Sequence, residues 1–147
     1  MDKQKALFLC TGNSARSQMA EAFLREYGRD RFESFSAGLE PKGIHPITVQ
    51  VMNEKGISLV GQSSKPLREY MNKVQFDWLI TVCADAKEKC PFFPGMGSRL
   101  HWPFDDPAEY KGTEQDKLEK FRSVRDSIES KIKEWLAEFD VLHSVIK

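Results

Sequence analysis

The sequence contains little that would tie it to a membrane, to nucleic acid or to an oxidising compartment. None of its apolar runs approaches the ~20 residues of a membrane span, and the start, Met1-Asp-Lys-Gln-Lys, leads into too few apolar residues for a signal-peptide core. Lysine plus arginine and aspartate plus glutamate both total 22, so no excess charge favours nucleic acid or anionic lipid. We expect a cytoplasmic protein in which any anion-binding site is local.

Cysteine is also scarce, with three residues at Cys10, Cys83 and Cys90. An odd number in an intracellular chain favours reactive or buried thiols over a structural disulfide framework. The 147 residues fit one domain, residues 1–147, and contain no internal repeat, linker or low-complexity tract. A chain of this size buries roughly 70% of its unfolded surface, so it needs no covalent staple.

Alternating strand-type and helix-type patterns predict an α/β fold. A buried strand over residues 5–9 precedes a helix over residues 17–27, whose apolar residues recur at helical spacing before Gly28 ends it. The alternation from Phe32 to Ala37 predicts a second strand, which completes a βαβ unit. Ligands bind at the carboxyl ends of the strands in open sheets of this kind.

The rest of the chain predicts five further elements and one surface segment. The elements are a helix over 46–54 that turns Val49, Met52 and Ile57 inward and ends at Gly56, a short helix over 67–71, a central strand over 76–83, a short strand over 100–102, and a long helix capped by Thr113. The long helix carries one apolar stripe of Leu118, Phe121, Val124, Ile128, Ile132, Trp135 and Phe139. Residues 84–97, polar and then rich in proline and glycine, predict a mobile surface segment that holds Cys90. We expect a single three-layer domain in which helices flank a four-stranded parallel sheet.

The turn after the first strand has the composition of an anion-binding site. This anion loop, residues 10–17, reads Cys-Thr-Gly-Asn-Ser-Ala-Arg-Ser and leads directly into a helix. Its backbone N–H groups are expected to point into one concavity, which is a site for an oxyanion. The oxyanion-binding residues are then Thr11, Gly12, Asn13, Ser14, Ala15, Arg16 and Ser17.

Cys10 is the candidate nucleophile at the rim of this loop. A lone cysteine after a strand is more often a small buried hydrophobic residue. Here the helix dipole, the loop amides and the Arg16 guanidinium all favour the thiolate, and Ser17 adds a hydroxyl donor. The planar fork of Arg16 suits a tetrahedral oxyanion bound through two oxygens. We therefore expect a cysteine that attacks a bound oxyanion.

Several motifs in order along the chain resemble one family. They are Cys-Thr-Gly-Asn-Ser-x-Arg-Ser-Gln-Met-Ala-Glu at 10–21, Ser-Ala-Gly at 36–38, Val-Cys-x-Asp at 82–85, Cys-Pro at 90–91, His-Trp at 101–102 and Phe-Asp-Asp-Pro-Ala at 104–108. This combination resembles the low-molecular-weight protein tyrosine phosphatases and, more closely, the thioredoxin-coupled arsenate reductases that share their fold. Cys-x5-Arg alone indicates only the phosphatase-like superfamily.

The resemblance implies a thiol relay with no cofactor. In that scheme Cys10 attacks arsenate, Arg16 and the loop amides hold the oxygens, and Asp106 protonates the departing hydroxyl. Cys83 then attacks the adduct and releases arsenite, which leaves a Cys10–Cys83 disulfide. Cys90 attacks Cys83 in turn, and thioredoxin is the expected reductant of the Cys83–Cys90 disulfide.

Alternative interpretations stand beside each of these roles. Asp105 and Asp106 are also ordinary turn formers before a proline, and the resemblance selects Asp106 as the acid. Cys83 and Cys90 are also readable as two unrelated thiols, or as zinc ligands with His101, although their spacing fits no common structural zinc site. We expect no metal, and no histidine is assigned to catalysis.

The resemblance also marks a set of cation-site positions. Asn13, Glu21, Ser36 and Ser63 match positions that hold potassium beside the catalytic loop in some relatives, which place an aspartate where this chain has Lys65. Our hypothesis is that the Lys65 ammonium replaces the ion and makes the protein independent of potassium. The alternative is a solvated loop lysine.

Two other functions remain open on the sequence. The same loop and aspartate would serve a low-molecular-weight tyrosine phosphatase that hydrolyses phosphate monoesters through a phosphocysteine. Ala108 stands where those phosphatases usually present an aromatic residue, and Cys83 and Cys90 would then have no role. A non-catalytic oxyanion-binding or redox-sensing module is the third possibility. In each case we expect a monomer without a nucleic-acid or membrane partner.

Overall fold

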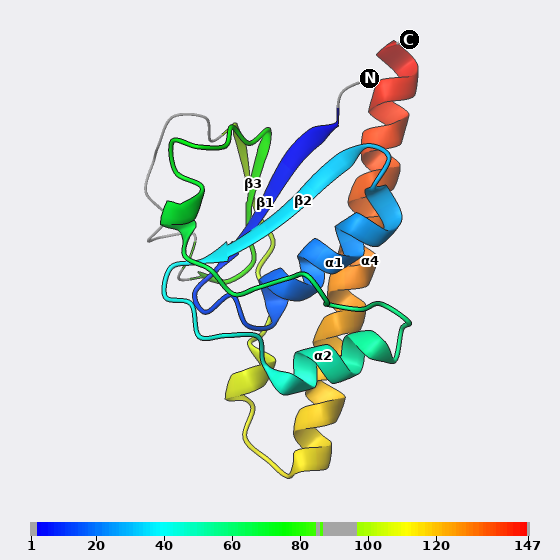
Figure 1. Cartoon of the computed structure of the whole chain (residues 1–147). Coiled ribbons are helices and arrows are strands. Elements are labelled where there is room, and N and C mark those ends of the chain that lie inside the picture. Colours follow the sequence, from blue (N-terminus) through cyan, green and yellow to red (C-terminus); the bar gives the residue numbers. More distant parts are fainter. Residues whose placement is uncertain (1–2, 85, 87–96, 147) are drawn as a thin grey trace.

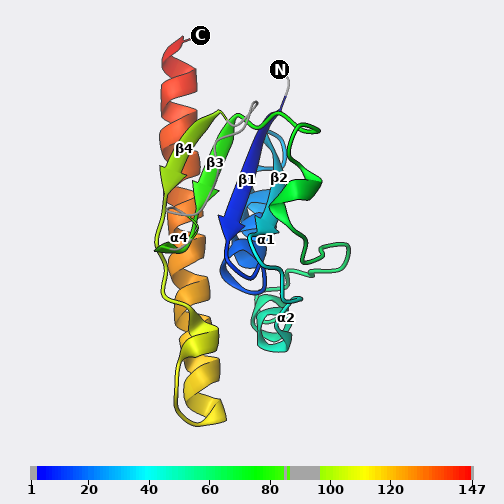
Figure 2. The ribbon, with the colours of Figure 1, turned by 90° about the vertical axis from the view of Figure 1, so that its left-hand side faces the viewer.

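A single parallel sheet of four strands organises the chain. In the computed structural model, which describes residues 3–84, 86 and 97–146, the strands are β1 (Gln4–Cys10), β2 (Phe32–Gly38), β3 (Trp78–Thr81) and β4 (Ser98–His101). Their order across the sheet is β2-β1-β3-β4, and every neighbouring pair is parallel (Figure 2). The predicted four-stranded parallel sheet is confirmed, and all four carboxyl ends lie at one edge.

The helices differ in which part of the sheet they cover. They are α1 (Arg16–Gly28), α2 (Pro46–Asn53), α4 (Glu114–Ile146) and two short 3-10 turns, η1 (Leu67–Glu69) and η2 (Pro107–Glu109). Helices α1 and α4 pack together on one face, while α2 lies beyond the carboxyl ends of the strands (Figures 1 and 2). The η1 turn lies on the opposite face, where the Tyr70 ring meets Phe35 edge-on at 5.5 Å. No helix in the described ranges is both long and apolar enough to cross a membrane.

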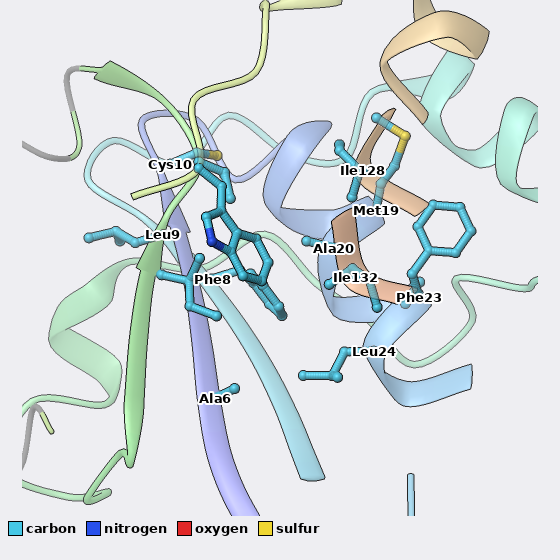
Figure 3. Close-up of a cluster of buried hydrophobic side chains, with 14 of the residues drawn as sticks. Ala6, Phe8, Leu9, Cys10, Met19, Ala20, Phe23, Leu24, Ile128 and Ile132 are labelled. Atoms are coloured by element: carbon cyan, nitrogen blue, oxygen red, sulfur yellow. The ribbon is translucent and has the colours of Figure 1, made fainter. Parts of the chain in front are cut away.

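The alternation of side chains along β1 explains the two layers of core. Ala6 and Phe8 point toward α1 and α4, whereas Leu7 and Leu9 point to the other face, and all four are fully buried. Figure 3 shows Phe8 among side chains of α1 and α4, with Leu9 directed away from them. A strand buried on both faces has the continuous apolar run that the sequence displays.

The long last helix begins and packs as the sequence predicts. The Thr113 hydroxyl accepts a hydrogen bond from the Asp116 N–H at 3.1 Å, and the Asp116 carboxylate accepts one from the Thr113 N–H at 3.2 Å. Six of the seven stripe residues are buried, and Leu118 is partly buried. Trp135 reaches the sheet, where its ring lies 4.9 Å from that of Phe32.

Helix α2 corrects one detail of the predicted core. Met52 and Ile57 are buried as predicted, but Val49 is 37% exposed and Val51 is fully buried in its place. The inward face is set by Thr48, whose hydroxyl donates to the Ser14 carbonyl oxygen at 3.1 Å. Residues one turn on from Thr48 therefore face the core, and Val49 is rotated away.

Other boundaries shift by a few residues. Strand β3 is shorter than the predicted 76–83, β4 starts two residues earlier than 100–102, and η1 is a 3-10 turn within the predicted 67–71 helix. Helix α2 ends at Asn53, and Gly56, with φ of 73°, lies in the turn that follows it. Gly28 is instead the last helical residue, where a Cβ would lie 3.0 Å from the Leu136 side chain. Most of the predicted mobile segment, residues 85 and 87–96, lies outside the described residues.

Candidate active site

The anion loop lies at the carboxyl edge of the sheet and lines a cavity of about 630 Å³. Cys10, the last residue of β1, and Arg16, the first residue of α1, both face this cavity. Cys83, which follows β3 closely, and residues 103–106, which follow β4, form the other side. Three adjacent strands therefore deliver the predicted groups to one cavity.

Donors from two parts of the loop converge on the Cys10 sulfur. The Asn13 N–H donates to Sγ at 3.1 Å, and the Ser17 hydroxyl lies 2.9 Å from Sγ. The Asn13 side-chain amide donates to the Ser17 oxygen at 2.8 Å. Because that oxygen already accepts a hydrogen bond, its own hydrogen is free to point at the sulfur. Both donors stabilise negative charge on Sγ, as a thiolate nucleophile requires.

The carbonyl oxygens of the loop are bonded from behind by the segment that follows β2. The N–H groups of Leu39, Glu40, Lys42 and His45 donate to the carbonyls of residues 10, 11, 12 and 14 at 3.1, 2.8, 2.9 and 3.0 Å. Within the described part of the chain, the N–H groups of residues 12, 14 and 15 donate to no other atom. With its carbonyls held outward, the loop presents free amides to an oxyanion.

Gly38 is required beneath the loop because no side chain fits there. A Cβ on this residue would lie 2.8 Å from the Thr11 carbonyl oxygen and 3.0 Å from the Asn13 nitrogen. Both neighbours are backbone atoms, which do not move without distorting the loop. This gives a physical reason for the Ser-Ala-Gly motif at 36–38. Asn13 itself adopts the left-handed conformation, with φ of 48°, which asparagine tolerates well.

Arg16 is positioned by groups on the segment after β4. One terminal nitrogen donates to the Phe104 carbonyl oxygen at 3.1 Å, and the other lies 3.4 Å from an Asp106 carboxylate oxygen. The second Asp106 oxygen caps η2 by accepting from the Ala108 N–H at 3.0 Å. Asp106 is thereby fixed at the cavity beside the anion loop, which is where a general acid is needed.

The neighbouring Asp105 is held differently. Its carboxylate accepts from the Lys120 ammonium at 2.8 Å, and that lysine keeps the pKa of the carboxyl below its usual value. The Asp105 side chain is 78% exposed, compared with 28% for Asp106. The structure thus places Asp106 rather than Asp105 beside the guanidinium.

Cys83 is brought to the loop and Cys90 lies outside the described residues. Both Cys10 and Cys83 are free and buried, with 2% and 4% exposure. The Cys83 sulfur lies 3.4 Å from the Thr11 hydroxyl, at hydrogen-bonding distance for sulfur. The second thiol of the predicted relay therefore lines the same cavity as the first.

The predicted cation-site positions form one hydrogen-bonded cluster. The Asn13 amide donates to the Ser36 hydroxyl at 3.0 Å, and the Ser36 hydroxyl donates to the Glu21 carboxylate. Burial raises the pKa of Glu21, while the Ser36 hydrogen bond and then the Lys65 charge oppose that rise. Lys65 donates its ammonium to the Ser63 carbonyl oxygen at 2.7 Å and its backbone N–H to the Asn13 side chain at 3.0 Å.

Lys65 is a partly buried cation in this cluster. Burial lowers the pKa of its ammonium, and the Glu21 carboxylate opposes that change. Its ammonium donates a hydrogen bond to the Ser63 carbonyl oxygen. No group of three or more histidine, cysteine, aspartate or glutamate side chains suitable for a metal occurs among the residues that the structure describes.

Three contacts at the site had no signal in the sequence. The Phe104 carbonyl that holds Arg16 and the amides of residues 39–45 that bind the loop are backbone groups, so residue type says nothing about them. Lys42 lines the cavity as well, and its position follows from the bond between its N–H and the Gly12 carbonyl. Only the fold reveals these groups.

The fold and the site together define a class of protein. A parallel sheet presents a buried cysteine, an amide-lined loop, an arginine and an aspartate to one cavity, which is the arrangement of an enzyme that attacks tetrahedral oxyanions through sulfur. Residues 5–143 match the low molecular weight phosphotyrosine protein phosphatase family, and the chain belongs to that family.

Several similar proteins within this family are arsenate reductases. The chain is 44% identical to an arsenate reductase of Shouchella clausii over 136 residues, which cover 92% of this chain and 96% of the relative. A solved structure of an arsenate reductase in the phosphate binding state superposes with a TM-score of 0.76 at 30% identity, covering 92% and 98% of the two chains.

A third similarity is to the thioredoxin-dependent arsenate reductase of Corynebacterium glutamicum. It has a TM-score of 0.68 at 26% identity, covering 96% of this chain and 63% of the other. The resemblance noted in the sequence is therefore confirmed at the level of the family and its arsenate reductase members.

Proposed function

We propose that this protein reduces arsenate to arsenite through a relay of Cys10, Cys83 and Cys90, and that thioredoxin reduces the final disulfide. The observation that carries the proposal is the position of Cys83, whose sulfur lies 3.4 Å from the Thr11 hydroxyl in the cavity that Cys10 lines. Hydrolysis of a phosphate ester through a phosphocysteine needs one thiol and water, so it does not require the second thiol. The arsenate reductase relatives support the same conclusion.

The first step is attack of the Cys10 thiolate on the arsenic of bound arsenate. An S–As bond forms, an As–O bond breaks, and Asp106 gives its proton to the leaving hydroxyl, which departs as water. Arg16 and the amides of the anion loop hold the remaining oxygens. Arsenic is still pentavalent in the Cys10 adduct, so no reduction has occurred.

The second step transfers two electrons to arsenic. Cys83 loses its proton to solvent and attacks the Cys10 sulfur, an S–S bond forms, and the electron pair of the broken S–As bond stays on arsenic. Arsenite leaves, and the Cys10–Cys83 disulfide carries the oxidation. The Cys90 thiolate then attacks Cys83 and releases Cys10 as thiolate, which moves the disulfide to Cys83–Cys90. The two thiols of thioredoxin reduce that disulfide and become oxidised themselves.

The lining of the cavity supports a small substrate. Ala108 follows the Asp-Pro pair, and among the described residues that line the cavity only Phe104 is aromatic. A phosphotyrosine ring would find little surface on which to stack. Tyrosine phosphatase activity is therefore the alternative outcome of the test below.

A coupled assay distinguishes the functions. Purified protein receives arsenate, thioredoxin, thioredoxin reductase and NADPH, and parallel samples receive p-nitrophenyl phosphate. We expect arsenate-dependent NADPH oxidation that disappears in Cys83→Ser. Phosphate-ester hydrolysis that survives Cys83→Ser, with no arsenate turnover in the wild type, would instead identify a phosphatase. Oxyanion binding without either reaction would identify a binding module.

We also propose that Lys65 supplies the positive charge that potassium supplies at this cluster in other members. Its charge opposes the rise that burial causes in the pKa of Glu21, and its N–H holds the Asn13 side chain that bonds Ser17. We further propose a single-domain monomer over residues 1–147 that acts in the cytoplasm. Size-exclusion chromatography with light scattering tests the oligomeric state.

A further inference from the structure

Lys42 is a cation at the mouth of the cavity that the proposed mechanism does not use. Its N–H donates to the Gly12 carbonyl oxygen at 2.9 Å, which fixes its backbone beside the anion loop. A Cβ on Gly12 would lie 3.4 Å from the Lys42 Cδ and 3.6 Å from its Cγ, so the aliphatic stem lies against the loop. The residue lines the same cavity as Cys10 and Arg16.

Among the described residues that line the cavity, Arg16 and Lys42 are basic, and of these two Arg16 alone has an ion-pair partner within the described part of the chain. Arg16 faces the Asp106 carboxylate at 3.4 Å. Of the other described cavity carboxylates, Asp105 is paired with Lys120 at 2.8 Å, and Glu109 forms no ion pair with Lys42. Across the residues that the structure describes, no carboxylate lies at ion-pairing distance from the Lys42 ammonium, which is exposed to solvent. Its charge is therefore available to an entering anion.

The charge at the reacting centre exceeds what Arg16 neutralises. The Cys10 thiolate and a tetrahedral oxyanion bring at least two negative charges into one cavity, where the Arg16 guanidinium supplies a single positive charge. The loop amides supply only partial charges. A second full positive charge beside Gly12 lowers the repulsion between sulfur and oxyanion and attracts the anion from solution.

We propose that Lys42 is a second cationic binding residue for the tetrahedral oxyanion, recruited to the loop through its contact with Gly12. The proposal rests on the loop being the oxyanion site of the proposed function, and it does not depend on the thiol relay. Because a lysine stem is flexible and exposed, its ammonium acts on capture of the anion rather than on the chemical step.

The test compares Lys42→Gln with Lys73→Gln, which removes the same charge elsewhere. Lys73 is exposed in the turn before β3, at the opposite end of that strand from Cys83. Inorganic phosphate is titrated against reduced protein, and its dissociation constant is read from protection of Cys10 against iodoacetamide. Arsenate KM and kcat are measured with thioredoxin at several salt concentrations.

We expect Lys42→Gln to raise the phosphate dissociation constant and the arsenate KM by about fivefold, with a much smaller change in kcat. In Lys42→Gln, kcat/KM should fall less steeply as salt is added. Lys42→Arg should retain most of the phosphate affinity, and Lys73→Gln should match the wild type. A phosphate constant in Lys42→Gln within twofold of that in Lys73→Gln would overturn the proposal. So would a loss confined to kcat.

The two proposals fail in different ways. If the wild type does not reduce arsenate but Lys42→Gln still weakens phosphate binding, the proposed reductase function is wrong and the proposed role of Lys42 holds. If phosphate does not protect Cys10 even in the wild type, the loop is not an oxyanion site and both are wrong.

Discussion

The Thr11 hydroxyl lies 3.4 Å from the Cys83 sulfur, although the two residues are 72 positions apart. Thr11 follows β1 and Cys83 follows β3, and the register between these parallel strands pairs Leu9 with Thr81. The residues two positions beyond that pair therefore meet above the edge of the sheet. The order of the strands alone thus brings a second thiol to the rim of the anion loop.

Replacing Asp106 by asparagine tests the general acid. Asparagine still accepts the Ala108 N–H that caps η2, so the local structure is retained while the transferable proton is lost. We expect kcat for arsenate to fall by about 100-fold or more. Asp105→Asn is the control, because its carboxylate is exposed and pairs with Lys120 instead of with Arg16. Equal losses in the two variants would refute the assignment.

Gly38→Ala tests whether the loop geometry depends on close approach of the second strand. The new Cβ would lie 2.8 Å from the Thr11 carbonyl oxygen, so we expect a loss of stability of about 1–3 kcal/mol together with weakened phosphate binding. In the control Gly112→Ala, the new Cβ would lie 2.9 Å from Asp116 Oδ2 and 3.0 Å from its Cβ, so stability also falls, but Gly112 does not line the cavity and phosphate binding should be unchanged. Urea unfolding and phosphate protection of Cys10 measure both effects. Wild-type phosphate affinity in Gly38→Ala would show that the loop does not need this glycine.

His45 links the stability of α2 to pH. Its Nδ1 accepts a hydrogen bond from the Ile47 N–H at 3.1 Å, so the helix is capped by the neutral imidazole. Burial and then the Lys117 charge lower the pKa of His45, while Asp106 opposes them. The unfolded chain then binds the proton more tightly than the folded one. The contribution of His45 to stability is complete above about pH 6.5 and is lost as the pH falls through its lower folded-state pKa.

The variant His45→Asn separates the cap from its titration. Asparagine accepts the same N–H but does not titrate, so its stability should fall less than that of the wild type between pH 7.5 and 5.5. Urea unfolding at several pH values measures the difference. Identical pH dependence in the two proteins would mean that His45 protonation has no part in it.

Much of the fold was predictable because the spacing of apolar residues along the chain shows which faces of its helices and strands are buried. The Thr113 cap, the stripe of α4 and the four-stranded parallel sheet follow from patterns in the sequence, whereas the order of the strands came from the structure. Val49 and Val51 are chemically identical, however, and the sequence could not tell which one faces inward. That choice depends on the Thr48 hydroxyl finding the Ser14 carbonyl, which is a tertiary contact.

The candidate active site also has residues that the sequence predicted and groups that only the structure revealed. Cys10 and Arg16 were recognisable from the Cys-x5-Arg spacing after a strand, and Asp106 was selected by the resemblance of the Asp-Asp-Pro motif at 105–107 to the family. The carbonyl of Phe104 and the amide of Lys42 were not recognisable, because every residue has these groups and only the fold determines which ones meet the loop. Gly38 was visible as part of a motif. The need for glycine at this position became clear only from the backbone atoms of Thr11 and Asn13 that lie against it.

Exchange of monovalent cations tests the role of Lys65. We expect equal wild-type activity in potassium and choline at equal ionic strength, because the positive charge of Lys65 already stabilises the Glu21 carboxylate. Lys65→Gln should be less stable, and potassium but not choline should restore part of that loss. A several-fold rise in wild-type activity with potassium would contradict the proposal.

The most direct test of the central claim is to locate the disulfide after one turnover. Reduced protein is mixed with arsenate in the absence of thioredoxin, quenched in acid and alkylated, and its peptides are identified by mass spectrometry. The account predicts one arsenite per chain, a Cys83–Cys90 disulfide and an alkylated Cys10, with a Cys10–Cys83 disulfide in Cys90→Ser. Arsenite formed in full yield by Cys83→Ser, or with Cys83 still reduced in the wild type, would contradict it.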